Sequence, residues 1–151
     1  MFNLFNKNKK DSDTLKYDKK LISKLHKDHQ KLVELIKTTH EAIEADNVKK
    51  SKKYLIKLRM AILEHFMEED IKLYLYLKKY HKEEINTLRT IETFEETIKE
   101  IQKDILSFLS KYSKEETELD AKFKEKFLVI VQKLSARIKT EESKLYTLYI
   151  K

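Results

Sequence analysis

The chain has 151 residues, a length typical of one domain, and it contains no glycine, no proline and no cysteine. A chain so rich in lysine, glutamate, leucine and isoleucine, and without glycine or proline, is predicted to be all-α, and glycine-rich nucleotide-binding loops are excluded. Disulfides, thiol nucleophiles and cysteine-ligated zinc are excluded as well. This is compatible with a reducing compartment, and we expect a cytoplasmic location.

The net charge of +7 does not by itself indicate a nucleic-acid partner. Most lysines stand beside glutamates at helical spacing, as on a solvated helix surface, and no basic block carries interleaved aromatic residues. No apolar run is long enough to cross a bilayer, and there is no secretory signal pattern. The opening stretch MFNLFNKNKK favours a flexible N-terminal arm over residues 1–14, with a weak interfacial membrane anchor as the alternative.

Four amphipathic helices are predicted in one domain over residues 15–151. Their apolar residues recur three and four positions apart, which is the core-facing pattern of a bundle helix. The expected helices cover residues 18–45, 48–80, 84–112 and 115–149. Asp46 and Asn47 favour a break after the first helix, and Ser113 with Glu116 matches a capping box for the fourth. Short connections between long helices predict an up-down-up-down antiparallel four-helix bundle.

Polar groups that can bind a metal interrupt three of these apolar stripes. His29 lies on the first, His65 and Glu69 lie one turn apart on the second, and Glu141 lies on the fourth. Inward-pointing histidine and carboxylate side chains build metal sites in bundle cores, and they suit iron, manganese or zinc. For His65 with Glu69, a plain hydrogen-bonded pair at the edge of the core is the alternative interpretation.

Three further histidines are less well placed. His26 borders the face of His29, whereas His40 lies near the end of its helix, where a simple hydrogen bond is the more ordinary role. His81 is expected at a surface or boundary position.

A second segment shares the pattern around His65. HFMEEDIKLY at 65–74 aligns without gaps on RIKTEESKLY at 137–146, so that Glu69 falls on Glu141 and His65 falls on Arg137. An internal duplication and a chance match between two lysine- and glutamate-rich helices both explain this alignment.

These stretches carry a resemblance to a known family. KDHQKLVEL at 27–35, EHFMEEDIKLYLYL at 64–77 and RIKTEESKLY at 137–146 resemble, in helix order, elements of the hemerythrin-like (HHE cation-binding) domains. The resemblance implies a hemerythrin-like bundle with a non-haem iron centre that handles oxygen, nitric oxide or iron. Carried over position by position, it implies the metal ligands His29, His65, Glu69 and Glu141, with the further candidates His26, His40, Glu68 and His81.

The ligand set is incomplete for a regular di-iron centre. Arg137 stands where the resemblance implies a histidine, and no histidine follows His81. We therefore expect a mononuclear or irregular di-iron site that takes a small diatomic ligand. The alternative is a metal-free bundle in which Arg137 is the counter-charge of the two core carboxylates, and which acts as a regulatory or protein-interaction module. In a third interpretation, Arg137 turns outward and pairs with Glu141 at the surface. No signature of a hydrolase or transferase is present.

Overall fold

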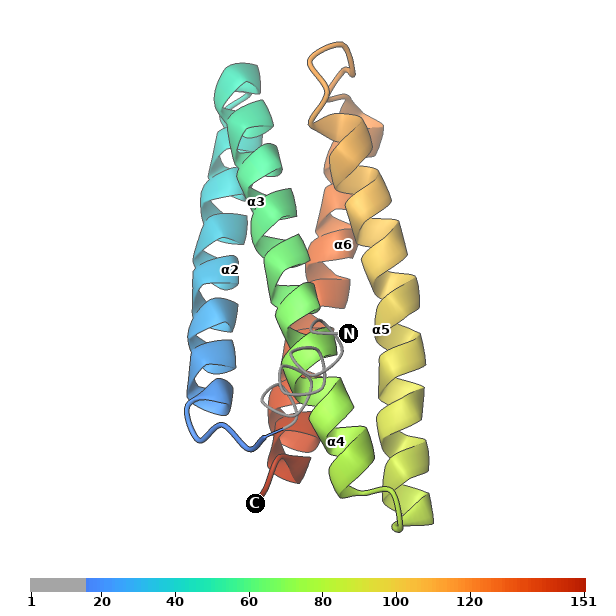
Figure 1. Ribbon diagram of the computed structural model, residues 1–151. Coiled ribbons are helices and arrows are strands. Elements are labelled where there is room, and N and C mark those ends of the chain that lie inside the picture. The colour runs from blue at the N-terminus through green and yellow to red at the C-terminus, as the bar shows by residue number, and fades with distance from the viewer. Residues whose placement is uncertain (1–15) are drawn as a thin grey trace, which may run out of the picture.

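The computed structural model describes residues 16–151, and the predicted N-terminal arm at 1–14 lies outside that range. Four long helical segments run alternately up and down and form an antiparallel bundle, as the sequence predicts (Figure 1). In chain order the elements are α2 (Leu21–Glu44), α3 (Val48–Glu68), the π-helical turn η1 (Glu69–Tyr74), α4 (Leu75–Tyr80), α5 (Ile85–Tyr112), α6 (Ala121–Thr140), the π-helical turn η2 (Glu141–Leu145) and the 3₁₀ turn η3 (Tyr146–Leu148).

The turn between α2 and α3 uses the two residues that the sequence indicates. Asp46 adopts the left-handed conformation with φ of 52°, which a short polar residue tolerates better than most. Asn47 then caps α3, because its side-chain oxygen accepts a 3.1 Å hydrogen bond from the backbone N–H of Lys50. These two residues reverse the chain without glycine.

The fourth helix begins later than predicted. Its N-cap is Asp120, whose carboxylate accepts a 2.9 Å hydrogen bond from the backbone N–H of Phe123. The capping box at Ser113 is wrong: Ser113 is the C-cap of α5, and its hydroxyl donates 3.3 Å back to the carbonyl of Ser110. Residues 113–120 therefore form the connection between α5 and α6.

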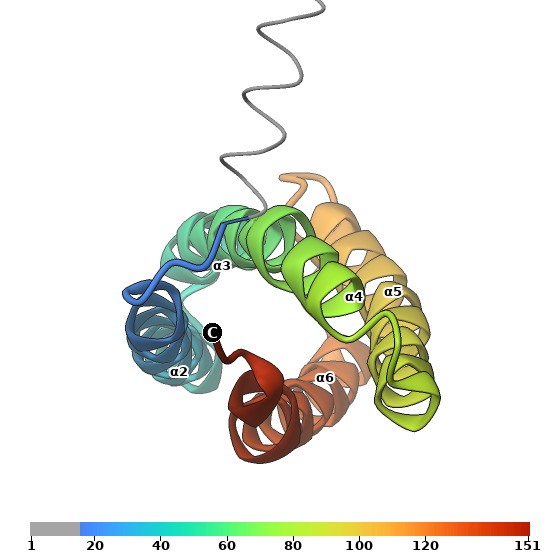
Figure 2. The ribbon, with the colours of Figure 1, turned by 60° about the horizontal axis from the view of Figure 1, so that its bottom comes forward.

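The apolar stripes meet along the axis of the bundle. Each long segment packs against two neighbours (Figure 2). Helix α2 contacts α3 and α6, and helix α5 contacts α6 and the second segment, which contains α3 and α4. Residues such as Leu25, Leu55, Ile98 and Phe123 are fully buried there. Phe94 and Ile101 of α5 are only partly buried. Within residues 16–151, no helix combines the length and the apolar character that a bilayer crossing requires.

Candidate metal centre

Two π-helical turns interrupt the second and fourth segments of the bundle. The first begins at Glu69 and the second at Glu141, so the two carboxylates that align in sequence also begin the same local distortion. A π turn shifts the backbone register and re-aims the side chains around it, and such turns occur frequently at functional sites. Both glutamate side chains are buried in the core.

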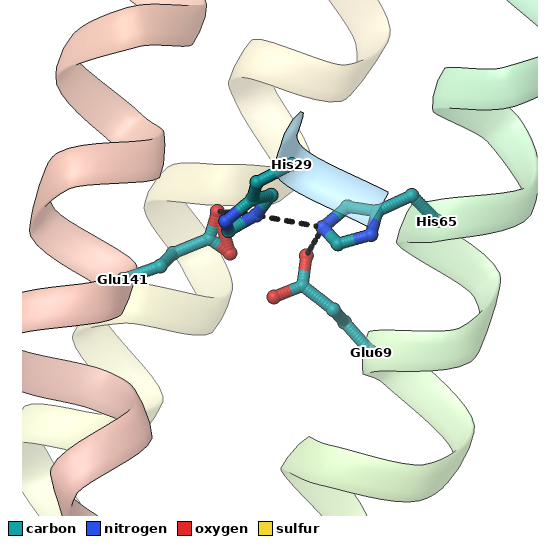
Figure 3. A group of neighbouring side chains, drawn as sticks. All are labelled: His29, His65, Glu69 and Glu141. Atoms are coloured by element: carbon teal, nitrogen blue, oxygen red, sulfur yellow. Dashed lines mark hydrogen bonds and ion pairs between the residues drawn. The ribbon is translucent and has the colours of Figure 1, made fainter. Parts of the chain in front are cut away.

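The structure brings His29, His65, Glu69 and Glu141 into one cluster. The Nε2 atoms of His29 and His65 lie 3.0 Å apart, and Glu69 Oε1 lies 3.0 Å from His65 Nε2. Glu141 Oε1 approaches His29 Nε2 at 3.8 Å from the fourth helical segment (Figure 3). One potential ligand atom from each of the four residues lies within 4.8 Å of the others, and no side chain in the cluster is more than 4% exposed.

The charges in the cluster are unequal. The pKa values of the two buried carboxyl groups shift in opposite directions. For Glu141, burial and a hydrogen bond to Glu69 both raise the pKa, which lies well above its ordinary value. For Glu69 the interactions with Glu141, His65 and His29 outweigh burial and lower the pKa to about 2. Glu69 is therefore the ionised partner, and Glu141 holds a proton when no cation is bound.

The donor set suits a cation, because several of its buried polar atoms have no hydrogen-bond partner within residues 16–151. Glu69 Oε1 accepts no hydrogen bond there although it lies 3.0 Å from a histidine nitrogen, and Glu141 Oε2 has none either. Buried polar atoms are almost always satisfied, so such a gathering requires an explanation. Two imidazole nitrogens and two carboxylates around one point are a ligand set for iron, manganese or zinc. The residues present therefore fit a metal ion.

The outward nitrogen of each cluster histidine faces a carboxylate. His29 Nδ1 lies 3.5 Å from Glu142 Oε2, and His65 Nδ1 lies 3.6 Å from Asp28 Oδ2. Metal-binding histidines usually direct their second nitrogen at such a group, which fixes the ring orientation and the tautomer. Sequence analysis missed both acids, although each stands next to a predicted ligand in the chain.

Tyr146 is a further residue that sequence analysis missed. Its hydroxyl donates a 3.1 Å hydrogen bond to Glu69 Oε2 and lies 3.2 Å from His29 Nε2. Burial raises the pKa of this phenol far above its ordinary value, so it keeps its proton and acts as a donor. The aligned Tyr74, which repeats the Lys-Leu-Tyr pattern at 72–74, is the one sequence signal that could have indicated Tyr146.

Two of the additional ligand candidates lie beside the cluster. His26 is partly exposed and directs Nδ1 to Glu142 at 3.2 Å, so it borders the cluster through that acid. Glu68 forms ion pairs with Lys24 and, at 3.2 Å, with Lys72. Neither contributes an atom to the four-residue cluster.

The other two histidines lie away from it. His40 is partly exposed and lies 3.7 Å from Glu44. The expected surface or boundary position of His81 is wrong, because this histidine is only 3% exposed. Its two ring nitrogens contact Glu84 and, at 2.8 Å, the carbonyl of Leu148. His81 thereby ties the turn between α4 and α5 to the C-terminal end of the chain.

Arg137 is buried, so the alternative in which it turns outward is wrong. The predicted pairing with the core carboxylates is not formed either: within the described residues, Nη2 donates at 3.0 Å to the Tyr74 hydroxyl and at 2.8 Å to the Phe94 carbonyl. The guanidinium also lies over the Phe94 ring, 5.0 Å from its centroid. Its charge acts on Glu141 only at longer range, where it lowers the pKa of that carboxyl against the effect of burial.

The fold and the cluster together define a four-helix bundle with a candidate metal site in its core. The family model described as the hemerythrin HHE cation binding domain matches residues 20–149, and the chain belongs to that family. No curated protein and no solved structure matches the chain.

Proposed function

We propose that the protein holds a single non-haem metal ion, iron by preference, through His29, His65, Glu69 and Glu141. The convergence of these four buried side chains is the observation that carries the proposal. Membership of a cation-binding family supports it independently. A cytoplasmic location remains our expectation from the absence of cysteine.

A single ion fits better than a pair. No second group of ligands occurs within residues 16–151, and α5 contains no histidine. Arg137 also places a fixed positive charge at the position that aligns with His65. A second cation on that side would lack donors and would be repelled by the guanidinium.

The cluster is suited to the handling of a small diatomic ligand or of iron itself. When bound, iron would supply an open coordination position and one-electron chemistry. A cavity of about 200 Å³ between α2 and α3 reaches His65 and is lined by Lys24, Asp28 and Glu68, among others. That volume admits molecules of the size of oxygen or nitric oxide. Tyr146 holds Glu69 in place from the opposite side, with its hydroxyl proton directed at the carboxylate.

A metal-free regulatory bundle is the second candidate function. It is favoured by the buried Arg137, whose charge eases the presence of Glu141 in the core without a cation. In that case the protein would act through a protein partner at its surface, and the cluster would be structural.

Elemental analysis of the purified protein, before and after anaerobic addition of iron, decides between the two candidates. We expect about one iron per chain and a new near-ultraviolet absorption band, and both should be lost in Glu69→Gln and in His65→Ala. His40→Ala is the matched control, since it removes an imidazole outside the cluster. A chain that takes up no metal would overturn the metal-binding function, and equal metal in all variants would place the site elsewhere.

A further inference from the structure

A separate cavity opens between α5 and α6. Its volume is about 640 Å³, within the range of small-molecule sites. α5 contributes Arg89, Thr93, Phe94 and Thr97, and α6 contributes Lys133 and Arg137. The two helices lie next to each other on one side of the bundle (Figure 2). We call this cavity the α5–α6 groove.

The groove is positively charged. Arg89, Lys133 and Arg137 line it, and within residues 16–151 no aspartate or glutamate contributes to the lining. The chain as a whole carries 26 acidic residues, so their absence from the groove is a local feature. A cavity with three cations and no counter-ion of its own favours an anionic ligand.

Arg137 is a preorganised anchor at the base of the groove. Its side chain is only 6% exposed, and Nη2 is fixed by the Tyr74 hydroxyl and the Phe94 carbonyl. Among the residues that the structure describes, the buried Nε of the same guanidinium has no hydrogen-bond partner. Guanidinium groups bind carboxylates through two parallel N–H donors, and a group already held in place loses little entropy on binding. The unpartnered Nε is thus a donor that the described part of the chain leaves unused.

Apart from Asn86, the rest of the lining is effectively apolar. Phe94, Ile101 and Ala136 contribute apolar surface. The hydroxyls of the lining threonines each donate to a backbone carbonyl one turn earlier, which leaves their hydrogen atoms unavailable to a ligand; these are Thr90, Thr93, Thr97 and Thr140. Hydrogen-bonding recognition in the groove therefore rests on its cations and on the side-chain amide of Asn86.

From the unpartnered guanidinium nitrogen and this lining we propose that the α5–α6 groove binds a small organic carboxylate with an apolar tail, its carboxylate at Arg137 and its tail along Phe94 and Ile101. Arg89 and Lys133 add attraction for the negative charge. The chain's own opening stretch MFNLFNKNKK is a poor occupant, because its basic cluster would meet three cations. The proposal is independent of the metal site.

Calorimetric titration with octanoate tests the proposal, with octanol, octylamine and inorganic phosphate as comparison probes. We expect octanoate to bind at least tenfold more tightly than each of the other three. Octanol and octylamine lack the negative charge that the cations attract, and phosphate lacks the apolar tail. Octanol binding as tightly as octanoate would show an apolar cleft without anion recognition, and phosphate binding as tightly would show a plain anion site. Either result would overturn the proposal.

Variants locate the site on the chain. Arg137→Gln and Lys133→Gln should each weaken octanoate binding, the first by about tenfold or more, because a charge-assisted hydrogen bond is lost. Thr97→Trp should fill the groove and abolish binding. The matched controls are Lys139→Gln on α6 and Ser107→Trp on α5, both at exposed positions outside the groove.

Two further comparisons keep the test decisive. If Arg137→Gln folds poorly, unchanged binding in both Lys133→Gln and Thr97→Trp would still overturn the proposal. Glu69→Gln should bind octanoate as the parent protein does, because the groove does not use the metal cluster. Loss of binding in Glu69→Gln would mean that the carboxylate had bound at the cluster instead, which would also overturn the proposal.

Discussion

Arg137 donates a 3.0 Å hydrogen bond to the Tyr74 hydroxyl, so its buried charge is held by a neutral group and not by a carboxylate. Tyr74 belongs to the first of the two aligned segments, residues 65–74, and Arg137 belongs to the second, residues 137–146. Tyr146, the counterpart of Tyr74, instead donates to Glu69. The two halves of the core thus share a framework but differ in chemistry, since one holds the His29–His65 cluster and the other holds the guanidinium.

Arg137→Ala should lower the free energy of unfolding by roughly 2–4 kcal/mol, because it removes buried packing and leaves the two acceptors of Nη2 unpaired. Tyr74→Phe, which removes only one of those acceptors, should cost about 0.5–1.5 kcal/mol. Urea denaturation followed by circular dichroism measures both values. Lys139→Ala is the control on the same helix, and an effect of Arg137→Ala no larger than the control would argue that the guanidinium is not held as described.

Tyr146→Phe tests the donor to Glu69. Removing the hydroxyl leaves a buried ionised carboxylate with one hydrogen bond fewer, at a cost of about 1–3 kcal/mol in the metal-free protein. Metal content should change little, since Tyr146 lies outside the four-residue ligand set. Thermal unfolding of the metal-free form and elemental analysis give the two readouts. Complete loss of metal in Tyr146→Phe would instead make the phenol a ligand.

Asp28 and Glu142 should tune the metal site through the histidines that they face. Asp28→Asn and Glu142→Gln are each expected to weaken metal affinity by about 10–100-fold, the usual effect of removing the group behind a ligating histidine. Competition with a chelator of known affinity measures the change. The control is Glu34→Gln, an exposed acid on the same helix as Asp28. Variants that retain the parent affinity would show that these acids do not orient His29 and His65.

The four cluster residues could be identified from the sequence because each is a polar residue on an otherwise apolar stripe. Burying such a group requires a partner, and the stripes show which groups face one another. Tyr146 could not be identified in this way, because an aromatic residue on an apolar stripe is ordinarily part of the core. Asp28 and Glu142 lie just off their stripes and contact the cluster only through the histidines.

Features that depend on long-range packing could not be predicted. The π turns at Glu69 and Glu141 shift a hydrogen-bond register that local propensity does not encode. The hydrogen-bond partners of Arg137 depend on the relative positions of α5 and α6 along the bundle axis, which place Phe94 beside the guanidinium. Family resemblance supplied the ligand positions but not the α5–α6 groove, because partly exposed residues at the edge of a stripe give no clear periodic signal.

The start of the fourth helix gives a simple test of local structure. Asp120→Ala should lower the free energy of unfolding by about 1 kcal/mol, because the backbone N–H of Phe123 loses its cap. Ser113→Ala should change it by less than about 0.5 kcal/mol, since that hydroxyl makes only a 3.3 Å bond at the end of α5. Urea denaturation distinguishes the two. A larger loss of unfolding free energy in Ser113→Ala than in Asp120→Ala would instead support the capping box at Ser113.

Metal binding should release protons, because Glu141 must be ionised to act as a ligand. Its pKa in the metal-free protein is raised by burial and by the hydrogen bond to Glu69. At a pH below that raised value, uptake of one ion should displace about one proton from Glu141, and affinity should increase with pH until the carboxyl is ionised. Calorimetry with zinc, in two buffers of different ionisation enthalpy, counts the protons released.

The same shift fixes the sign of the stability change in the metal-free protein. A carboxyl whose pKa is higher in the folded state contributes stability that is fully present below its unfolded pKa and is lost as pH rises through the folded value. Glu69 acts in the opposite direction, with stability lost only as pH falls from its ordinary pKa toward about 2. Glu141→Gln keeps a neutral side chain at every pH, so it should remove both the proton release and this loss of stability at higher pH. Proton release that persists unchanged in Glu141→Gln would assign the displaced proton to another group, with His65 the next candidate because its pKa is also raised.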